Sequence, residues 1–101
     1  MALLKIDIDR NIEDFDYLAF NQTVDFVEGM MRIKFDRAFY RSKGGNVHVM
    51  LNTDAFLEDL EVLALQAILG SDWKRELHNL CRIRRGQKNW NILFKHLEVS
   101  V

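Results

Sequence analysis

Three short segments alternate apolar and polar residues with a period of two, and this pattern limits the fold more than any other feature of the sequence. Residues 4–9 alternate strictly. In residues 46–51, Val47, Val49 and Leu51 alternate with Asn46, His48 and Met50, and residues 35–41 are rich in aromatic side chains interspersed with charged ones. Successive side chains of a β-strand point to opposite faces of its sheet. Each segment is therefore predicted to be a strand with one buried face.

Paired glycines, Gly44 and Gly45, separate the second of these segments from the third. Glycine adopts a positive φ at little steric cost, and two-residue hairpin turns require it. We therefore expect these two strands to form a hairpin.

Apolar residues recur at helical spacing in three other places. The first is residues 16–31; the second helix can be capped by Thr53 or Asp54 and is ended by Gly70. A third helix runs from Ser71 to Gly86, with Trp73, Leu77 and Leu80 at the spacing of a buried stripe. Residues 90–94 are predicted to be a last strand.

The resulting order is strand, helix, strand, strand, helix, helix, strand. It predicts an α+β fold of the ferredoxin or RRM type, in which a four-stranded antiparallel sheet carries the helices on one face. With 101 residues, 49% of them hydrophobic, the chain has room for one modest core. We expect a single palm-like α+β domain spanning residues 1–101.

Composition excludes several classes of protein. The chain has no proline and one cysteine, Cys81, so proline-rich linkers and an internal disulfide framework are excluded. It has neither the apolar run of a membrane span nor the basic and apolar regions of a signal peptide. We expect a cytoplasmic protein without a membrane partner.

The net charge of −1 conceals alternating blocks of charge. Residues 1–31 carry two bases and seven acids, and residues 54–61 carry four acids and no base. Residues 32–43 and residues 72–101 are each basic in balance. The blocks can neutralise one another within the fold, or the two basic segments can share a face that meets a polyanion such as DNA or RNA.

The most specific candidate site combines Asp7, Asp9 and His48. If the first and third strands are neighbours, the three side chains lie together on the sheet face opposite the helices. Two carboxylates at positions i and i+2 can hold a divalent cation such as Mg²⁺ or Mn²⁺, and the histidine can contact a phosphate or bind the softer metal. The alternative is an ordinary solvated sheet face, which is polar without any function.

The hairpin and a later basic run supply further candidates. Hairpin residues suited to phosphate oxygens are Arg41, Ser42 and Lys43, together with the amides of the two glycines. The later run is suited to binding nucleic-acid phosphates and stacking a base, and consists of Arg82, Arg84, Arg85, Lys88 and Trp90. The helix dipole also favours lysine and arginine side chains near the C-terminus of a helix, so this run is equally typical of a solvated helix terminus.

Two of these segments carry a family resemblance. The sequence Ile6-Asp7-Ile8-Asp9, followed by Tyr40-Arg41-Ser42-Lys43-Gly44-Gly45-Asn46-Val47-His48-Val49, resembles the first two motifs of archaeo-eukaryotic-type primases and primase-polymerases. The stretch Leu69-Gly70-Ser71-Asp72-Trp73-Lys74-Arg75 and the later residues Arg82 to Phe94 also resemble small phage and archaeal-virus proteins of uncertain role, which keep only this palm-like core. The resemblance implies that Asp7 and Asp9 bind catalytic metal ions and that Ser42 and His48 contact nucleotide phosphates.

The chain departs from this family in two ways. Residues 90–94 offer no carboxylate for the third acidic motif, and the chain is shorter than a complete primase catalytic domain. Both departures argue against full polymerase activity. The sequence thus predicts a protein of nucleic-acid metabolism, encoded by a virus or mobile element, that binds nucleotides or phosphates through a metal. The alternatives are a non-catalytic nucleic-acid-binding module and a self-assembling protein such as a homodimer.

Overall fold

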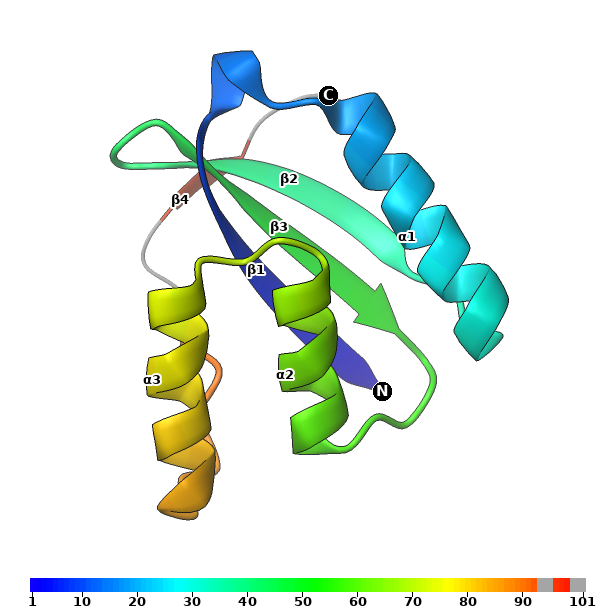
Figure 1. Cartoon of the computed structure of the whole chain (residues 1–101), viewed down its shortest axis with the longest axis vertical. Helices are drawn as coiled ribbons and strands as arrows, with labels where there is room; N and C mark the ends of the chain where they lie inside the picture. Colours follow the sequence, from blue (N-terminus) through cyan, green and yellow to red (C-terminus); the bar gives the residue numbers. More distant parts are fainter. Residues whose placement is uncertain (93–95, 99–101) are drawn as a thin grey trace.

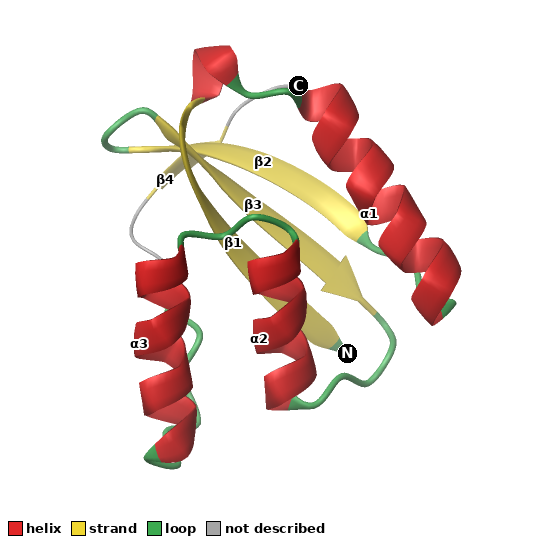
Figure 2. Ribbon diagram, viewed as in Figure 1, coloured by secondary structure: helices red, strands yellow, loops and turns green. Residues whose placement is uncertain are grey.

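The computed structural model describes residues 1–92 and 96–98. In this part of the chain three α-helices and an antiparallel sheet form a small α+β fold (Figures 1 and 2). In chain order the elements are β1 (Ala2–Asn11), a 3-10 turn (Ile12–Asp14), α1 (Tyr17–Met31), β2 (Asp36–Ser42), β3 (Asn46–Thr53), α2 (Asp59–Ile68), α3 (Trp73–Arg84) and β4 (His96–Glu98).

The sheet has the strand order β1-β3-β2-β4, and every neighbouring pair is antiparallel. The predicted hairpin joins β2 to β3. Its Gly45 has a φ of 89°, in the left-handed region that favours glycine. The predicted neighbourhood of the first and third strands is also confirmed, with Asp7 opposite His48.

The core lies between the sheet and helices α1 and α2. Fully buried side chains come from alternate positions of β1 and β3, as the period of two predicts: Leu4, Ile6, Val47, Val49 and Leu51. Apolar residues of both helices complete the same cluster: Phe20, Val24, Val27, Val62, Leu65 and Leu69. Figure 1 shows α1 and α2 on one side of the sheet. We call the opposite side the second face.

The second helix begins later than the sequence predicted. Its N-cap is Glu58, whose side chain and that of Glu61 form a reciprocal capping box, so Thr53 and Asp54 are not the cap. Phe56 lies outside the helix and is 78% exposed. The capping box stabilises a start at Asp59 because it satisfies amides that a helix terminus leaves unpaired.

The four-stranded ferredoxin-like sheet is confirmed only in part. Three of its strands have seven to ten residues, whereas β4 has only three. Residues 90–92 form no strand, and residues 93–94 lie outside the described part of the chain. β4 pairs with β2 rather than with β1. The ferredoxin order, which places the first strand inside the sheet, is therefore wrong here, because β1 lies at an edge.

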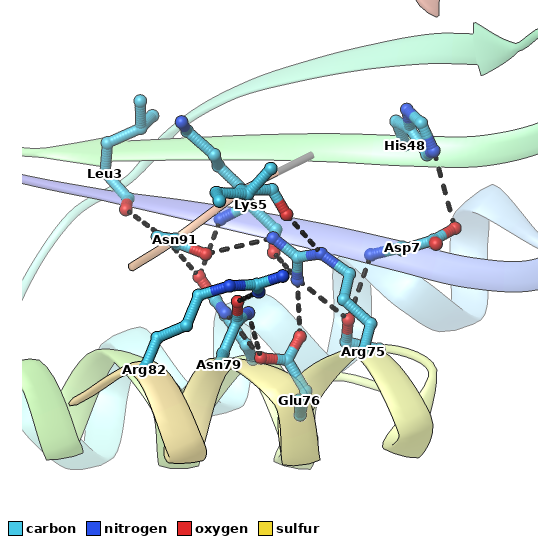
Figure 3. Close-up of polar contacts among 12 residues, drawn as sticks. Leu3, Lys5, Asp7, His48, Arg75, Glu76, Asn79, Arg82 and Asn91 are labelled. Carbon is cyan, nitrogen blue, oxygen red and sulfur yellow. Dashed lines mark hydrogen bonds and ion pairs between the residues drawn. The ribbon is translucent and has the colours of Figure 1, made fainter. Parts of the chain in front are cut away.

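Side chains occupy the position beside β1 where a further strand would pair (Figure 3). The Lys5 amide donates to Gln66 Oε1 at 2.8 Å, and the Asp7 amide donates to Ser71 Oγ at 3.0 Å. Arg75 Nη1 donates to the Lys5 carbonyl at 2.7 Å. We call the residues that seal this edge the edge cluster: Gln66, Ser71, Arg75, Glu76, Asn79 and Asn91.

The third helix is turned opposite to the prediction. Its predicted core stripe is solvent-exposed, with Trp73 at 68%, Leu77 at 51% and Leu80 at 42%. Its buried residues are instead Arg75, Glu76 and Asn79. The reason is the neighbour: α3 lies along the edge of β1, whose unpaired backbone groups require polar partners.

Candidate functional site

The predicted contact between Asp7 and His48 is present on the second face of the sheet. The two residues are paired across β1 and β3, and His48 Nε2 lies 3.4 Å from Asp7 Oδ1. Tyr40 is the partner of His48 on the other side, so Asp7, His48 and Tyr40 form a row across three strands. Alternation along each strand places all three side chains on the same face.

Asp7 and His48 differ in their exposure to solvent, and this limits which of them can contact a ligand. The His48 side chain is 2% exposed, whereas that of Asp7 is 20% exposed. A ligand arriving from solvent therefore reaches the carboxylate and not the imidazole. The arrangement does not fit the predicted direct contact between His48 and a phosphate, and it fits a histidine that orients a carboxylate.

Asp7 is held firmly through its backbone. Its amide donates to Ser71 Oγ, and its carbonyl accepts from the Asp72 amide at 2.6 Å. Both partners belong to the turn between α2 and α3. The edge cluster thus fixes the position of Asp7, and rigid support of this kind is typical of functional side chains.

Asp9 lies beyond an irregularity of the strand. The pairing of β1 with β3 shifts between Ile8 and Asn11, so regular alternation ends there. Asp9 is exposed, and its Oδ1 accepts from Asn46 Nδ2 at 3.2 Å. The structure brings Asp7 to His48 and Asp9 to Asn46. In the described residues no group of three or more His, Cys, Asp or Glu is arranged to hold a metal ion.

The hairpin is less available to phosphate than the sequence suggested. Ser42 Oγ accepts from the Asn46 amide at 3.0 Å, and the Gly45 amide donates to the Ser42 carbonyl at 3.0 Å. Arg41 and Lys43 are exposed. Arg41 is paired with Val47, a core residue, so strand alternation places it on the helix-bearing side and away from Asp7.

The basic run after residue 81 divides into accessible and inaccessible residues. Arg84, Arg85 and Lys88 are exposed, and half-buried Arg82 donates to Asn79 Oδ1 at 2.8 Å. Trp90 is 4% exposed and belongs to the core cluster. The prediction that Trp90 stacks on a base is therefore wrong, because its ring is packed inside the protein.

Sequence reasoning missed the edge cluster. Arg75 is its centre: Nε donates to the Ile92 carbonyl at 2.9 Å, Nη2 to Asn91 Oδ1 at 2.9 Å, and Nη1 to Glu76 Oε2 at 2.5 Å (Figure 3). Burial lowers the pKa of Arg75, and the carboxylates of Glu76 and Asp7 partly offset this effect. The available signal was the polar stripe formed by Arg75, Glu76 and Asn79 on one side of a helix whose other side is apolar.

Comparisons with known proteins add nothing to the assignment of this site. No helix among the described residues is long and apolar enough to cross a membrane. No protein-family model, curated protein or solved structure matches the chain.

Proposed function

We propose that the chain is a protein of nucleic-acid metabolism that binds a nucleotide phosphate through a divalent cation on the second face of the sheet. The observation that carries the proposal is Asp7, a partly exposed carboxylate whose backbone is fixed by the edge cluster and whose side chain adjoins buried His48. The resemblance of the surrounding segments to primase-polymerase motifs supports the same assignment.

Asp7 and Asp9 are the residues that would hold the cation. Their carboxylates are oxygen donors, which Mg²⁺ and Mn²⁺ accept, and Mg²⁺ commonly uses one or two carboxylates with water and substrate phosphate. Fewer than three protein ligands therefore fit a site completed by the nucleotide. When bound, the cation would supply positive charge to the phosphate oxygens.

His48 is assigned a positioning role through Asp7. An imidazole beside a carboxylate restricts the orientation of that carboxylate, as outer partners of metal ligands do. Lys43 is exposed at the hairpin and is available to offset phosphate charge. The chain's own groups would thus bind and orient the phosphate.

Isothermal calorimetry of the full chain with Mn²⁺ and a nucleoside triphosphate tests this proposal. We expect binding that Asp7→Asn abolishes and that His48→Gln weakens by about 10- to 100-fold. Asp36→Asn is the matched control. Asp36 is an exposed carboxylate that pairs with Asn52, at the end of β2 far from Tyr40 and His48. Absence of binding at millimolar metal, or equal loss in the Asp36 variant, contradicts the proposal.

A non-catalytic nucleic-acid-binding module is the second candidate. Exposed Arg84, Arg85 and Lys88 at the end of α3 favour it. Binding of single-stranded DNA should then weaken steeply as salt increases, and Arg85→Ala with Lys88→Ala should reduce the slope of that dependence by about one to two. Binding that is absent or independent of salt excludes this candidate.

A further inference from the structure

The solvent side of the α2–α3 pair carries exposed apolar side chains that cover nothing in the described chain, and on α3 they are flanked by exposed Lys74 and His78. After its first turn α2 has one polar residue, Gln66, and that residue is buried. Exposed side chains of the two helices include Leu60, Ile68, Trp73, Leu77 and Leu80. A helix that is apolar on nearly all sides is normally buried, and contiguous exposed apolar surface marks an interaction site.

Acidic and basic residues lie close to each other at one end of the α2–α3 pair, because the two helices run in opposite directions. α2 and α3 are joined by a short turn and run side by side in opposite directions, so the start of α2 and the end of α3 lie at the same end of the pair (Figure 1). The start of α2 is acidic, with Glu58, Asp59 and Glu61. The end of α3 is basic, with exposed Arg84 and Arg85. Within residues 1–92 none of these five residues forms an ion pair with another.

We propose that a second copy of this chain covers the α2–α3 surface in a twofold-symmetric dimer. A twofold axis parallel to the helices places α3 of one copy on α2 of the other, with the basic end of α3 against the acidic end of α2. The contact is self-complementary, because each copy contributes one acidic and one basic end. Apolar stripes then meet in the centre and opposite charges meet at one rim, which is the usual anatomy of an interface.

The stripe on α3 supports this pairing in detail. Trp73, Leu77, Leu80 and Arg84 are spaced by four, three and four residues, so they share one side of the helix. Arg84 therefore continues the apolar stripe at its basic end. A large exposed tryptophan and an arginine are the residue types most enriched where interfaces bind strongly. This proposal is independent of the phosphate site, which lies on the other side of the sheet.

Sedimentation velocity and light scattering of the full chain across concentration test the dimer. We expect twice the 11.9 kDa monomer mass at high concentration. Leu77→Glu and Ile68→Lys, each at an exposed position, should each weaken dimerisation by at least tenfold, while circular dichroism shows the parent helix content. Leu18→Glu is the matched control, since Leu18 is 70% exposed on α1 and outside the proposed surface.

Reversal of charge tests the orientation of the two copies. Arg84→Glu should weaken the dimer, and adding Asp59→Arg in the same chain should restore it, because the two substituted residues face each other across the interface. A constant monomer mass overturns the proposal. A dimer that is lost in Leu18→Glu but kept in Leu77→Glu also overturns it, since association then uses α1. Failure of Asp59→Arg to restore association overturns the parallel orientation of the axis.

Discussion

Helices α1 and α3 pack against different parts of one sheet: α1 buries mainly apolar side chains, whereas all the buried side chains of α3 are polar or charged. The buried residues of α1 are Phe20, Val24, Val27 and Glu28. Those of α3 are Arg75, Glu76 and Asn79. α1 covers a sheet face, where backbone groups are paired within the sheet and apolar contact suffices. α3 lies along a sheet edge, where every second residue directs an N–H and a C=O outward.

The difference shows that a helix beside a sheet edge must supply hydrogen bonds before it supplies apolar contact. At Lys5 and Asp7 this demand is met, because the amide and the carbonyl of each residue have hydrogen-bond partners outside the sheet. The cluster is also satisfied internally: in residues 1–92 no buried side-chain nitrogen or oxygen lacks a hydrogen-bond partner. The same rotation of α3 that satisfies β1 turns its apolar stripe to solvent. The sealed edge and the exposed apolar surface are therefore two consequences of one packing choice.

Replacing Arg75 should have the largest effect on stability. Arg75→Leu removes the guanidinium from the Lys5 and Ile92 carbonyls and leaves the buried Glu76 carboxylate without its cation. Breaking a buried charged pair on one side costs about 3–5 kcal/mol. Urea denaturation should measure this loss of unfolding free energy, with exposed Arg41→Leu as the control. A loss below about 1 kcal/mol would mean that the edge cluster contributes little.

Truncating an apolar side chain should have an effect of intermediate size on stability, and the effect should differ between α1 and α3. Val24 of α1 is fully buried, so Val24→Ala should cost about 2 kcal/mol through lost burial and a residual cavity. Leu77 of α3 is exposed, so Leu77→Ala should change the stability of the monomer by less than about 0.5 kcal/mol. Thermal and urea denaturation at low protein concentration should give this ranking. Equal costs would contradict the orientation of α3.

Removing one hydroxyl from the edge should have the smallest measurable effect. Ser71→Ala deletes the acceptor of the Asp7 amide. An unsatisfied backbone group of this kind costs about 1–3 kcal/mol, and partial exposure of Asp7 places the expected value near the lower limit. The same variant should weaken cation binding at Asp7. Unchanged stability and unchanged binding together would show that Ser71 does not position the carboxylate.

The strands and their buried faces could be predicted from the sequence. With a period of two, Val47 and Val49 lie on the same face of the strand, and as apolar residues they are expected on the buried one. The contact of Asp7 with His48 followed from the same alternation. The orientation of α3 could not be predicted in this way. Helical spacing shows that Trp73 and Leu77 share a side, but which side is buried depends on whether the neighbour is a sheet face or a sheet edge. The sequence did not show that β1 is an edge strand, and the orientation of α3 depends on this.

Trp90 was misassigned for a related reason. The basic side chains near it in the sequence made Trp90 resemble a residue that stacks on a nucleobase, yet its ring is buried in the core. Asn91 donates to the Leu3 carbonyl at 3.3 Å and holds this segment beside β1. A contact between residues 88 positions apart in the chain leaves no local pattern in the sequence.

Hydrogen exchange of the Lys5 and Asp7 amides tests the sealed edge most directly. Both amides point away from β3, and at an open edge they would exchange as rapidly as unprotected groups. Because Gln66 and Ser71 accept their hydrogen bonds, we predict protection close to that of the β3 amides, with selective loss at Asp7 in Ser71→Ala. Rapid exchange at both positions in the unmodified chain would contradict the sealed edge.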